Sequence, residues 1–438
     1  MSNSILQDLS RRRFLSHTGG SLAAIAAATI SPSFLGKAHA GETLTLMMSQ
    51  PQVAGARHAA AAFLEATGIA VEVVAVPLDQ TYQQIALDQA SGANRFDCFD
   101  FWYIALGSVA EEGLALDLTD LIERDREMIN PDDFVPSVYD AYSLWNGRRY
   151  ALPFDGDTHA LFYNKEILAK HGVTPPKTWD ALNAAAQKIT EAEAGNGVHG
   201  LALMGAPVPI LVIATFANRL ANFGGSFVDA DGRPSLNTEA AYAAAANMAD
   251  VAPFCTPTPA EVGFTEALNA FIGGKAAMTE GWIDLGVFAQ DEANSAIVDK
   301  WDVVPLPVGP GVDASRAPLN AGWTLGVSAK TEKQEAAWEF VKFATSAKMG
   351  LDLITTTGSG IDPFRISNMN DPAYKAFNEK SQRAASASLN GAVSWPRNPK
   401  STRMLERLTD EIAAMLAGEQ SPMQAMDRTQ RAWERLMR

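Results

Sequence analysis

The stretch YALPFDGDTHALFYNKEIL, residues 150–168, decides how this chain folds. Its apolar runs predict strands inside a protein, yet Asp155, Asp157, Thr158 and His159 interrupt them. Buried polar groups need partners, so such an interruption requires an explanation. The polar residues form either a surface turn between two strands or the lining of a cavity that holds a polar ligand.

The first forty residues differ from the rest of the chain. SRRRFLS (10–16) is basic, GGSLAAIAAATI (19–30) is apolar, and AHA (38–40) has the small residues of a cleavage site. This order is typical of a secretory signal peptide. The paired arginines before Phe14 and Leu15 resemble a twin-arginine export signal, with Ser16 in place of the usual lysine. We expect cleavage after about Ala40 and a periplasmic location.

An uncleaved membrane anchor is the alternative for this segment. The apolar run is short and rich in alanine and glycine, which makes it a poor bilayer span. The chain has 438 residues and a formal net charge of −15. This length predicts about two lobes, and the acidity argues against nucleic acid or an anionic membrane as the partner.

The chain contains two cysteines, Cys98 and Cys255, far apart in the sequence. An exported protein can form disulfides. A chain of this size does not need one, so we expect two separate buried thiols rather than a bridge.

Strand and helix patterns alternate through the first part after residue 40. Apolar runs predict strands over 43–48, 71–76 and 97–103, and helical patterns lie over 56–68 and 80–92. This order predicts βαβ units and a parallel sheet, with ligands bound beyond the carboxyl ends of the strands. A second α/β region follows, with strands expected at 201–205, 275–281, 301–307 and 322–329. Its helices are expected at 175–190, 240–251, 264–274, 333–346 and 421–437, the first of them beginning at Thr178.

Four segments in register resemble one family. YALPFDGDTHALFYNKEILAKHGVTPPKTWDAL (150–182) is similar to the central signature of the sugar-binding branch of the extracellular solute-binding proteins of bacterial ABC importers, the branch that includes maltose-binding protein. AFIGGKAAMTEGW (270–282), NAGWTLGVSAKTEKQEAAWEFVKFATS (320–346) and GSGIDPFRIS (358–367) resemble the signatures that follow it. The similarity covers almost all of the chain after the leader.

This resemblance implies an α/β protein with the two-lobed, type II periplasmic-binding-protein fold. Each lobe would be a mostly parallel sheet flanked by helices, with the ligand cleft between the lobes. The N-terminal lobe would comprise residues 41–155 and 300–350, and the C-terminal lobe residues 156–299 and 351–438. The segment around Asp157 would then be the place where the chain leaves one lobe for the other.

The resemblance also implies ligand contacts. Carboxylates and amides suit sugar hydroxyls, and flat aromatic rings suit the apolar faces of a pyranose. Asp157 matches an acidic ligand-binding position, and Asp155 and His159 are its neighbours on the same segment. The remaining candidates are Gln50 after the first strand, for which a helix-entry turn is the alternative, and Trp102 and Tyr103 at the end of the third. Trp282 and Trp323 complete the set, with core packing as the alternative.

Arg365 leaves two interpretations open. Its guanidinium could anchor an anionic group, which would favour a glycerol phosphate, a sulfonated sugar or a uronate as ligand. It could equally form a salt bridge that holds its own loop.

An exported glycoside hydrolase or lyase is the alternative from another class, because Asp155, Asp157 and Glu280 could hide a carboxylate pair. No metal-spaced histidine pair, nucleophile elbow or phosphate-binding loop is present. We therefore expect no catalysis, cofactor or metal. The expected partners are a small carbohydrate and the membrane permease of an ABC importer, with the protein itself a monomer that works by hinge closure.

Overall fold

The computed structural model describes residues 41–256, 258–316, 318–389 and 393–438. The predicted signal segment lies outside the described residues. Within the described ranges, no helix combines the length and apolar character that crossing a bilayer requires.

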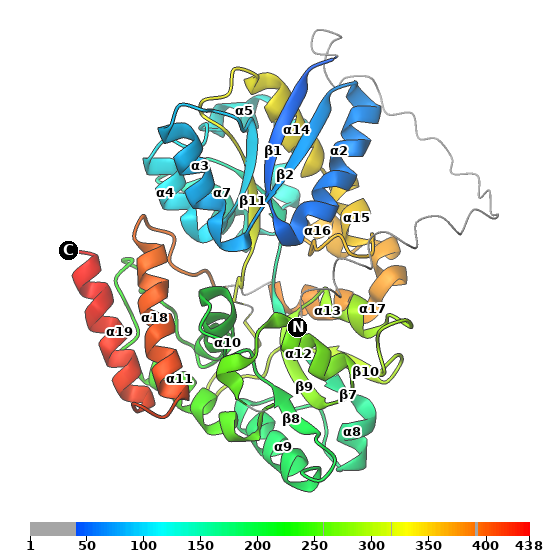
Figure 1. The fold of residues 1–438 in the computed structure, drawn as a ribbon, viewed down its shortest axis with the longest axis vertical. Helices are drawn as coiled ribbons and strands as arrows, with labels where there is room; N and C mark the ends of the chain where they lie inside the picture. Colours follow the sequence, from blue (N-terminus) through cyan, green and yellow to red (C-terminus); the bar gives the residue numbers. More distant parts are fainter. Residues whose placement is uncertain (1–40, 257, 317, 390–392) are drawn as a thin grey trace, which may run out of the picture. The chain divides into compact units, whose positions relative to one another are not determined.

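The first sheet has five strands in the order β2-β1-β3-β11-β6 (Figure 1). Their bounds are β1 Thr43–Ser49, β2 Ala70–Val76, β3 Cys98–Trp102, β11 Trp323–Val327 and β6 Leu152–Asp155. β1 runs parallel to β2 and β3, as the alternating pattern predicts, whereas β11 runs antiparallel to both of its neighbours. We call this sheet and its helices the first lobe.

The second sheet has four strands in the order β10-β7-β9-β8. Their bounds are β10 Trp301–Val304, β7 His159–Asn164, β9 Ala276–Trp282 and β8 His199–Ala202. β8 and β9 are parallel, and β7 runs antiparallel to β9 and β10. This sheet and its helices form the second lobe.

The reversed strand in each sheet marks where the chain arrives from the other lobe. β6 of the first sheet continues into β7 of the second, and β10 of the second sheet precedes β11 of the first. Each sheet is therefore mostly parallel with one reversed strand. The expected α/β architecture with two sheets is confirmed.

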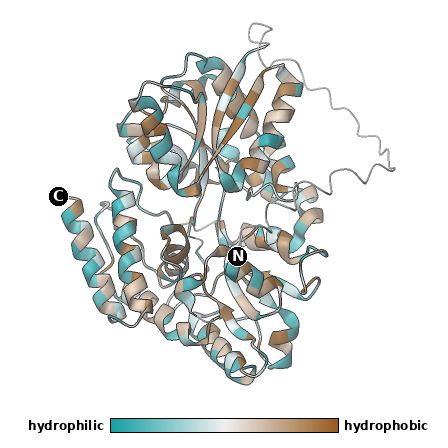
Figure 2. Cartoon of the chain, in the orientation of Figure 1, coloured by the Kyte–Doolittle hydropathy of each residue, from teal (hydrophilic) through white to brown (hydrophobic). Residues whose placement is uncertain are grey.

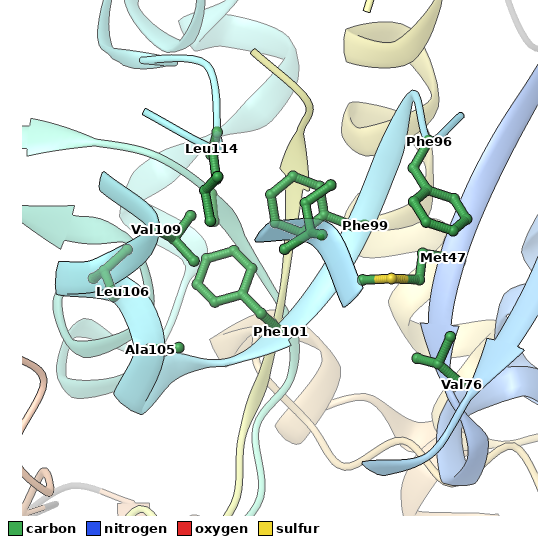
Figure 3. Packing of buried hydrophobic residues seen from close by; sticks show 12 residues of the cluster. Met47, Val76, Phe96, Phe99, Phe101, Ala105, Leu106, Val109 and Leu114 are labelled. Carbon is green, nitrogen blue, oxygen red and sulfur yellow. The ribbon is translucent and has the colours of Figure 1, made fainter. Parts of the chain in front are cut away.

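The helices of the first lobe cover both faces of its sheet (Figure 1). They are α2 Val53–Thr67, α3 Thr81–Ala90, α4 Leu106–Glu111, α5 Thr119–Arg124, α6 Arg126–Ile129, α7 Pro136–Ser143, α14 Gln334–Ala344, α15 Ala347–Ile354 and α16 Ile366–Met369. Figure 3 shows part of the core beneath them: Phe101 of β3 lies beside Leu106 and Val109 of α4, and Phe99 of β3 lies beside Met47 of β1. Strands covered on both faces read as continuous apolar runs, which is why they were predictable.

The helices of the second lobe are α8 Lys165–Lys170, α9 Trp179–Ala192, α10 Pro209–Asn222, α11 Glu239–Val251, α12 Phe264–Ile272, α13 Leu285–Ala289, α17 Pro372–Ser388, α18 Ser401–Leu416 and α19 Pro422–Leu436. The predicted start of α9 is confirmed, because the Thr178 side chain accepts a hydrogen bond from the backbone N–H of Ala181. Figure 2 shows hydrophilic residues along α18 and α19, whose apolar faces pack on α10 and α11. The helices of this lobe without a counterpart among those expected from the sequence are α8, α10, α13, α17 and α18.

Two crossings between the lobes differ from the expected boundaries. The return was expected near residue 300, yet β10 still pairs with β7, so the chain rejoins the first sheet only at Trp323. A third crossing was expected near residue 350, but α15 packs on α2 of the first lobe, and α17 is the next helix to contact β7 and β10. The residue types of a buried strand or helix do not state which sheet it will join, so these boundaries depend on tertiary pairing.

Cys98 and Cys255 are free and buried. Cys98 begins β3 in the first lobe, and Cys255 follows α11 in the second. Burial raises the pKa of both thiols, which keeps them in the unreactive protonated form.

Candidate functional site

A cavity of about 380 Å³ is lined by residues from both lobes. The first lobe contributes residues after β1 and β2 and the loop between α15 and α16. The second lobe contributes the first turns of α10 and α12, the end of β9 with α13, and one face of α17. The lining includes Gln52, Leu78, Asp157, Ile210, Phe264, Trp282, Asp284, Trp323, Asp362, Tyr374, Phe377 and Asn378.

The first crossing segment delivers Asp157 to this cavity. β6 ends at Asp155 and β7 begins at His159, so the three residues between them pass from one sheet to the other. Gly156 lies so close to the loop before α16 that a Cβ atom would stand 2.0 Å from the carbonyl oxygen of Pro363. Only glycine fits this approach, and it allows the next residue to enter the cavity.

The second crossing segment holds Asp157 from the other side. The backbone N–H of Gly322 donates to Oδ2 of Asp157 at 2.8 Å. Gly322 has a φ of 92°, and a Cβ atom there would meet the Tyr142 hydroxyl at 1.9 Å. The glycine before Trp323 is therefore required by both backbone conformation and space. Trp323 then begins β11 and lines the cavity.

Trp282, the last residue of β9, is held in place by a hydrogen bond and two aromatic contacts. Its indole Nε1 donates to the carbonyl oxygen of Asn320 at 3.0 Å. The rings of His159 and Phe264 lie edge-on to it, with centroids 4.4 Å and 5.6 Å away. These contacts fix the orientation of an indole whose remaining surface lines the cavity.

Three carboxylates line the cavity: Asp157, Asp284 after β9, and Asp362 in the loop before α16. Asp155 lies next to them, where it accepts hydrogen bonds from the Gln52 side chain at 3.1 Å and from the backbone N–H of Asp362 at 2.7 Å. Burial raises the pKa of Asp155 to about 7 and that of Asp284 to about 6.

The other two carboxyls of this group are also perturbed. Burial raises the pKa of Asp157 well above its usual range, and repulsion from Asp155 and Asp362 raises it further. Burial, followed by repulsion from Asp284 and Asp155, has the same effect on the pKa of Asp362. A cluster of carboxyls with shifted pKa values in a cavity indicates a candidate functional site.

Comparison with known proteins identifies this arrangement. The family described as bacterial extracellular solute-binding protein matches residues 49–350. The chain belongs to this family. A probable amino-acid ABC transporter periplasmic-binding protein from Sinorhizobium fredii is 29% identical over 386 residues, which cover 86% of this chain and 84% of that protein.

Two further relatives have named ligands. The mannitol-binding protein of Pseudomonas aeruginosa is 28% identical over 228 residues, about half of each chain. A solute-binding protein from Agrobacterium radiobacter K84, solved in complex with ribitol, is 25% identical with a TM-score of 0.80. That match covers 90% of this chain and 99% of the other.

Of the residues that the sequence suggested for this solute-binding protein, the structure brings Asp157, Trp282 and Trp323 to one cavity. His159 lies behind them, fully buried, with its Nδ1 3.0 Å from the Asn218 amide nitrogen. Burial lowers the pKa of His159 to about 3, so the ring is neutral. It supports Trp282 rather than lining the cavity.

The candidates near the ends of β1 and β3 do not line the cavity. Gln50 is exposed, and Gln52, two residues on, is the glutamine in the lining. Trp102 packs beside the cavity and donates to the carbonyl oxygen of Ala321 at 2.9 Å. Tyr103 is fully buried, where its hydroxyl donates to the carbonyl oxygen of Leu319.

Arg365 holds its own loop to the first lobe, which is the second of the two interpretations left open. Its guanidinium lies 3.3 Å from Asp133 and 3.8 Å above the ring of Phe134. It also donates to the carbonyl oxygens of Ile129 and Thr345, and its side chain is 2% exposed. Arg365 is not among the residues that line the cavity.

Several lining residues were not predicted. Asp284 lies two residues beyond the signature segment that ends at Trp282, and Asp362 lies within the segment 358–367, three residues before Arg365. Tyr374, Phe377 and Asn378 belong to α17, a helix with no predicted counterpart. The signal available was the aromatic spacing of Tyr374 and Phe377, which places both on one helix face.

Proposed function

We propose that this solute-binding protein is exported to the periplasm, captures a small polyhydroxylated solute, a monosaccharide or a polyol, and delivers it to an ABC import permease. The ribitol and mannitol of its relatives support this solute class. The leader-like residues 1–40 support export.

The observation that carries the proposal is the composition of the cavity. Aromatic rings from both lobes, Trp282, Trp323 and Phe377 among them, share it with three carboxylates. Rings suit the C–H faces of a polyol or sugar, and carboxylate oxygens accept from its hydroxyls. The volume of about 380 Å³ is at the small end of ligand sites, which favours one sugar unit over a long oligosaccharide.

An anionic sugar conjugate is disfavoured. Arg365, the residue that would anchor its charge, is committed to Asp133 and backbone carbonyls. The described lining contains three aspartates and no lysine, arginine or histidine, so an anionic solute would meet like charge.

Catalysis is not part of the proposed role. Glu280, one of the carboxylates that a glycosidase could have used, is 3% exposed and is held by both nitrogens of Arg219. We propose that the solute leaves the protein unchanged, as expected for a family of solute-binding proteins.

The proposed mechanism is closure of the two lobes over the solute. The crossing segments near Gly156 and Gly322, and the one before α17, are the places where backbone rotation would move one lobe against the other. A solute that contacts both lobes stabilises the closed form, so binding and closure support each other.

Calorimetry with a panel of monosaccharides and polyols tests the proposal. A hit should also raise the melting temperature, because a ligand at 100-fold its Kd stabilises a protein by about 2.7 kcal/mol. Phe377→Ala, on a half-exposed ring of the lining, should weaken binding at least 10-fold, whereas Leu87→Ala on the exposed face of α3 should not. The absence of any hit across the panel would refute the proposed solute class.

Small-angle scattering addresses the closure step. The radius of gyration should fall when a bound solute is present. A radius that stays the same in the saturated protein would remove closure from the mechanism. Release of a new product from the panel sugars would contradict the non-catalytic role.

A further inference from the structure

Part of the hydrogen-bonding capacity of the cavity lining is used within the protein. Thr356 and Ser381 line it, but their hydroxyls donate to the carbonyl oxygens of Asp352 and Ile283. The amide nitrogen of Gln52 donates to Asp155. Each of these three groups therefore donates one hydrogen bond within the protein.

Two carboxylate oxygens of the lining remain without a donor in the described part of the chain. Oδ1 of Asp284 and Oδ2 of Asp362 are buried, and neither accepts a hydrogen bond from the described residues. Asp362 is only 4% exposed and lines the cavity. A buried carboxylate oxygen without a donor is costly, so these two positions indicate that a donor is supplied from outside the chain.

The charge of the cavity lining is unbalanced. Asp157, Asp284 and Asp362 line the cavity and Asp155 adjoins it, whereas no lysine, arginine or histidine is among the described residues of the lining. Around the carboxylates are the rings of Trp282, Trp323 and Tyr374. Carboxylates combined with aromatic faces in a desolvated site form the usual environment for an organic cation.

A metal ion does not meet this need. Among the residues that the structure describes, no group of three or more His, Cys, Asp or Glu side chains could hold a metal ion. The carboxylates line a cavity large enough for a small organic molecule, rather than converging on a point.

We infer that the solute carries a protonated amine on its polyhydroxylated skeleton, and that Asp284 and Asp362 receive this ammonium group while the aromatic rings hold the carbon skeleton. This inference rests on the proposed function and narrows its solute class. An ammonium group offers three donors and no acceptor, which matches the two free carboxylate oxygens. It also supplies the positive charge that the lining lacks.

The experiment compares matched pairs of solutes by calorimetry at pH 7.5. D-glucitol is paired with 1-amino-1-deoxy-D-glucitol, ribitol with its 1-amino-1-deoxy counterpart, and D-glucose with D-glucosamine and N-acetyl-D-glucosamine. We expect at least one amine to bind at least 10-fold more tightly than its neutral partner, and the acetylated form to lose that gain.

Variants locate the effect. In Asp362→Asn and Asp284→Asn the ratio of the two dissociation constants should fall to near 1. Asp410→Asn, on the exposed face of α18, should retain the wild-type ratio. Circular dichroism of each variant establishes that it is folded, and the two aspartate variants test the same point independently.

The outcomes separate the two proposals. Neutral polyols or sugars that bind as tightly as their amines would overturn the amine inference and leave the proposed function standing. A wild-type preference that persists in both aspartate variants would overturn the assignment of these residues. A panel without any bound member, neutral or aminated, would overturn the proposed function and this inference with it.

Discussion

The second lobe has buried charged side chains in its interior and others in the cavity. Those in the interior are paired within the described part of the chain, and those in the cavity are not. In the interior, Arg219 donates to both carboxylate oxygens of Glu280 at 2.9 Å and 3.0 Å, to Asn247 and to the carbonyl oxygen of Thr215, and it lies over the ring of Trp179. In the cavity, Asp284 shares its surroundings with Asp157 and Asp362, and none of them has a cation of the chain beside it in the described lining.

This difference distinguishes charged residues that stabilise the fold from charged residues that serve the cavity. The interior pair is balanced within the chain, so its role is to hold α10 against β9. The cavity group is balanced only if something else enters. Arg365 with Asp133 belongs to the first kind, although the sequence made it a candidate for the second.

The largest expected effect comes from breaking the interior pair. Arg219→Met should lower the free energy of unfolding by about 3–5 kcal/mol, because Glu280 would remain buried without a cation. Urea unfolding followed by circular dichroism measures the loss.

A double variant sharpens this prediction. Arg219→Met with Glu280→Leu should regain most of the stability, since no uncompensated charge is left. If the single variant proves as stable as the wild-type protein, the Arg219–Glu280 pair does not stabilise the second lobe, and the contrast with the cavity carboxylates is wrong.

The loop that Arg365 holds gives the next largest effect. Arg365→Met should cost roughly 2–4 kcal/mol, because Asp133 and two backbone carbonyls lose a buried charged donor. The same unfolding assay applies. A variant with wild-type stability that no longer binds solute would instead assign this guanidinium to the ligand.

Substitution of a cavity carboxylate should raise the stability of the protein rather than lower it. Asp362→Asn should stabilise the unliganded protein at pH 8 by roughly 1 kcal/mol, the usual size of a single-residue effect, because it removes a buried charge that lacks a counter-ion. Thermal unfolding from pH 4 to pH 8 measures this gain against the wild-type protein.

The sign of the pH dependence follows from the raised pKa values. A carboxyl whose pKa is higher in the folded than in the unfolded state stabilises the fold at low pH, and this contribution is lost as the pH rises from about 4 through the raised values, about 6 for Asp284 and about 7 for Asp155. Stability should fall over this range, less steeply in Asp362→Asn. His159, whose pKa burial lowers to about 3, contributes the opposite slope equally to both proteins. Parallel curves for the two proteins would contradict the assignment.

The smallest effect is expected at Gln50. Gln50→Ala should change stability and solute binding by less than about 0.5 kcal/mol, because the side chain is exposed outside the cavity lining. Gln52→Ala is the matched comparison and should cost about 1 kcal/mol in stability, since Asp155 loses a buried donor. A strong loss of binding in Gln50→Ala would restore the sequence-based assignment.

Some of the site was predictable because its signals are local. Asp157 follows a strand that ends at Asp155, and Trp282 and Trp323 stand beside glycines in segments that resemble family signatures. Asp284 and Asp362 could not be singled out in this way. Aspartates are common in loops, and only their convergence from different lobes distinguishes these two.

The sequence by itself determined part of the elements: apolar runs specify strands covered on both faces, and the alternation with helices specifies the parallel pairing of β1 with β2 and β3. Gly156 and Gly322 allow the crossing segments to pass close to Pro363 and Tyr142. Tertiary structure decided which sheet β10 joins, which charges are paired, and which are left facing the cavity. The physical reason is that burial and repulsion depend on neighbours from distant segments. The role of a carboxylate therefore cannot be inferred from the residues next to it in the sequence.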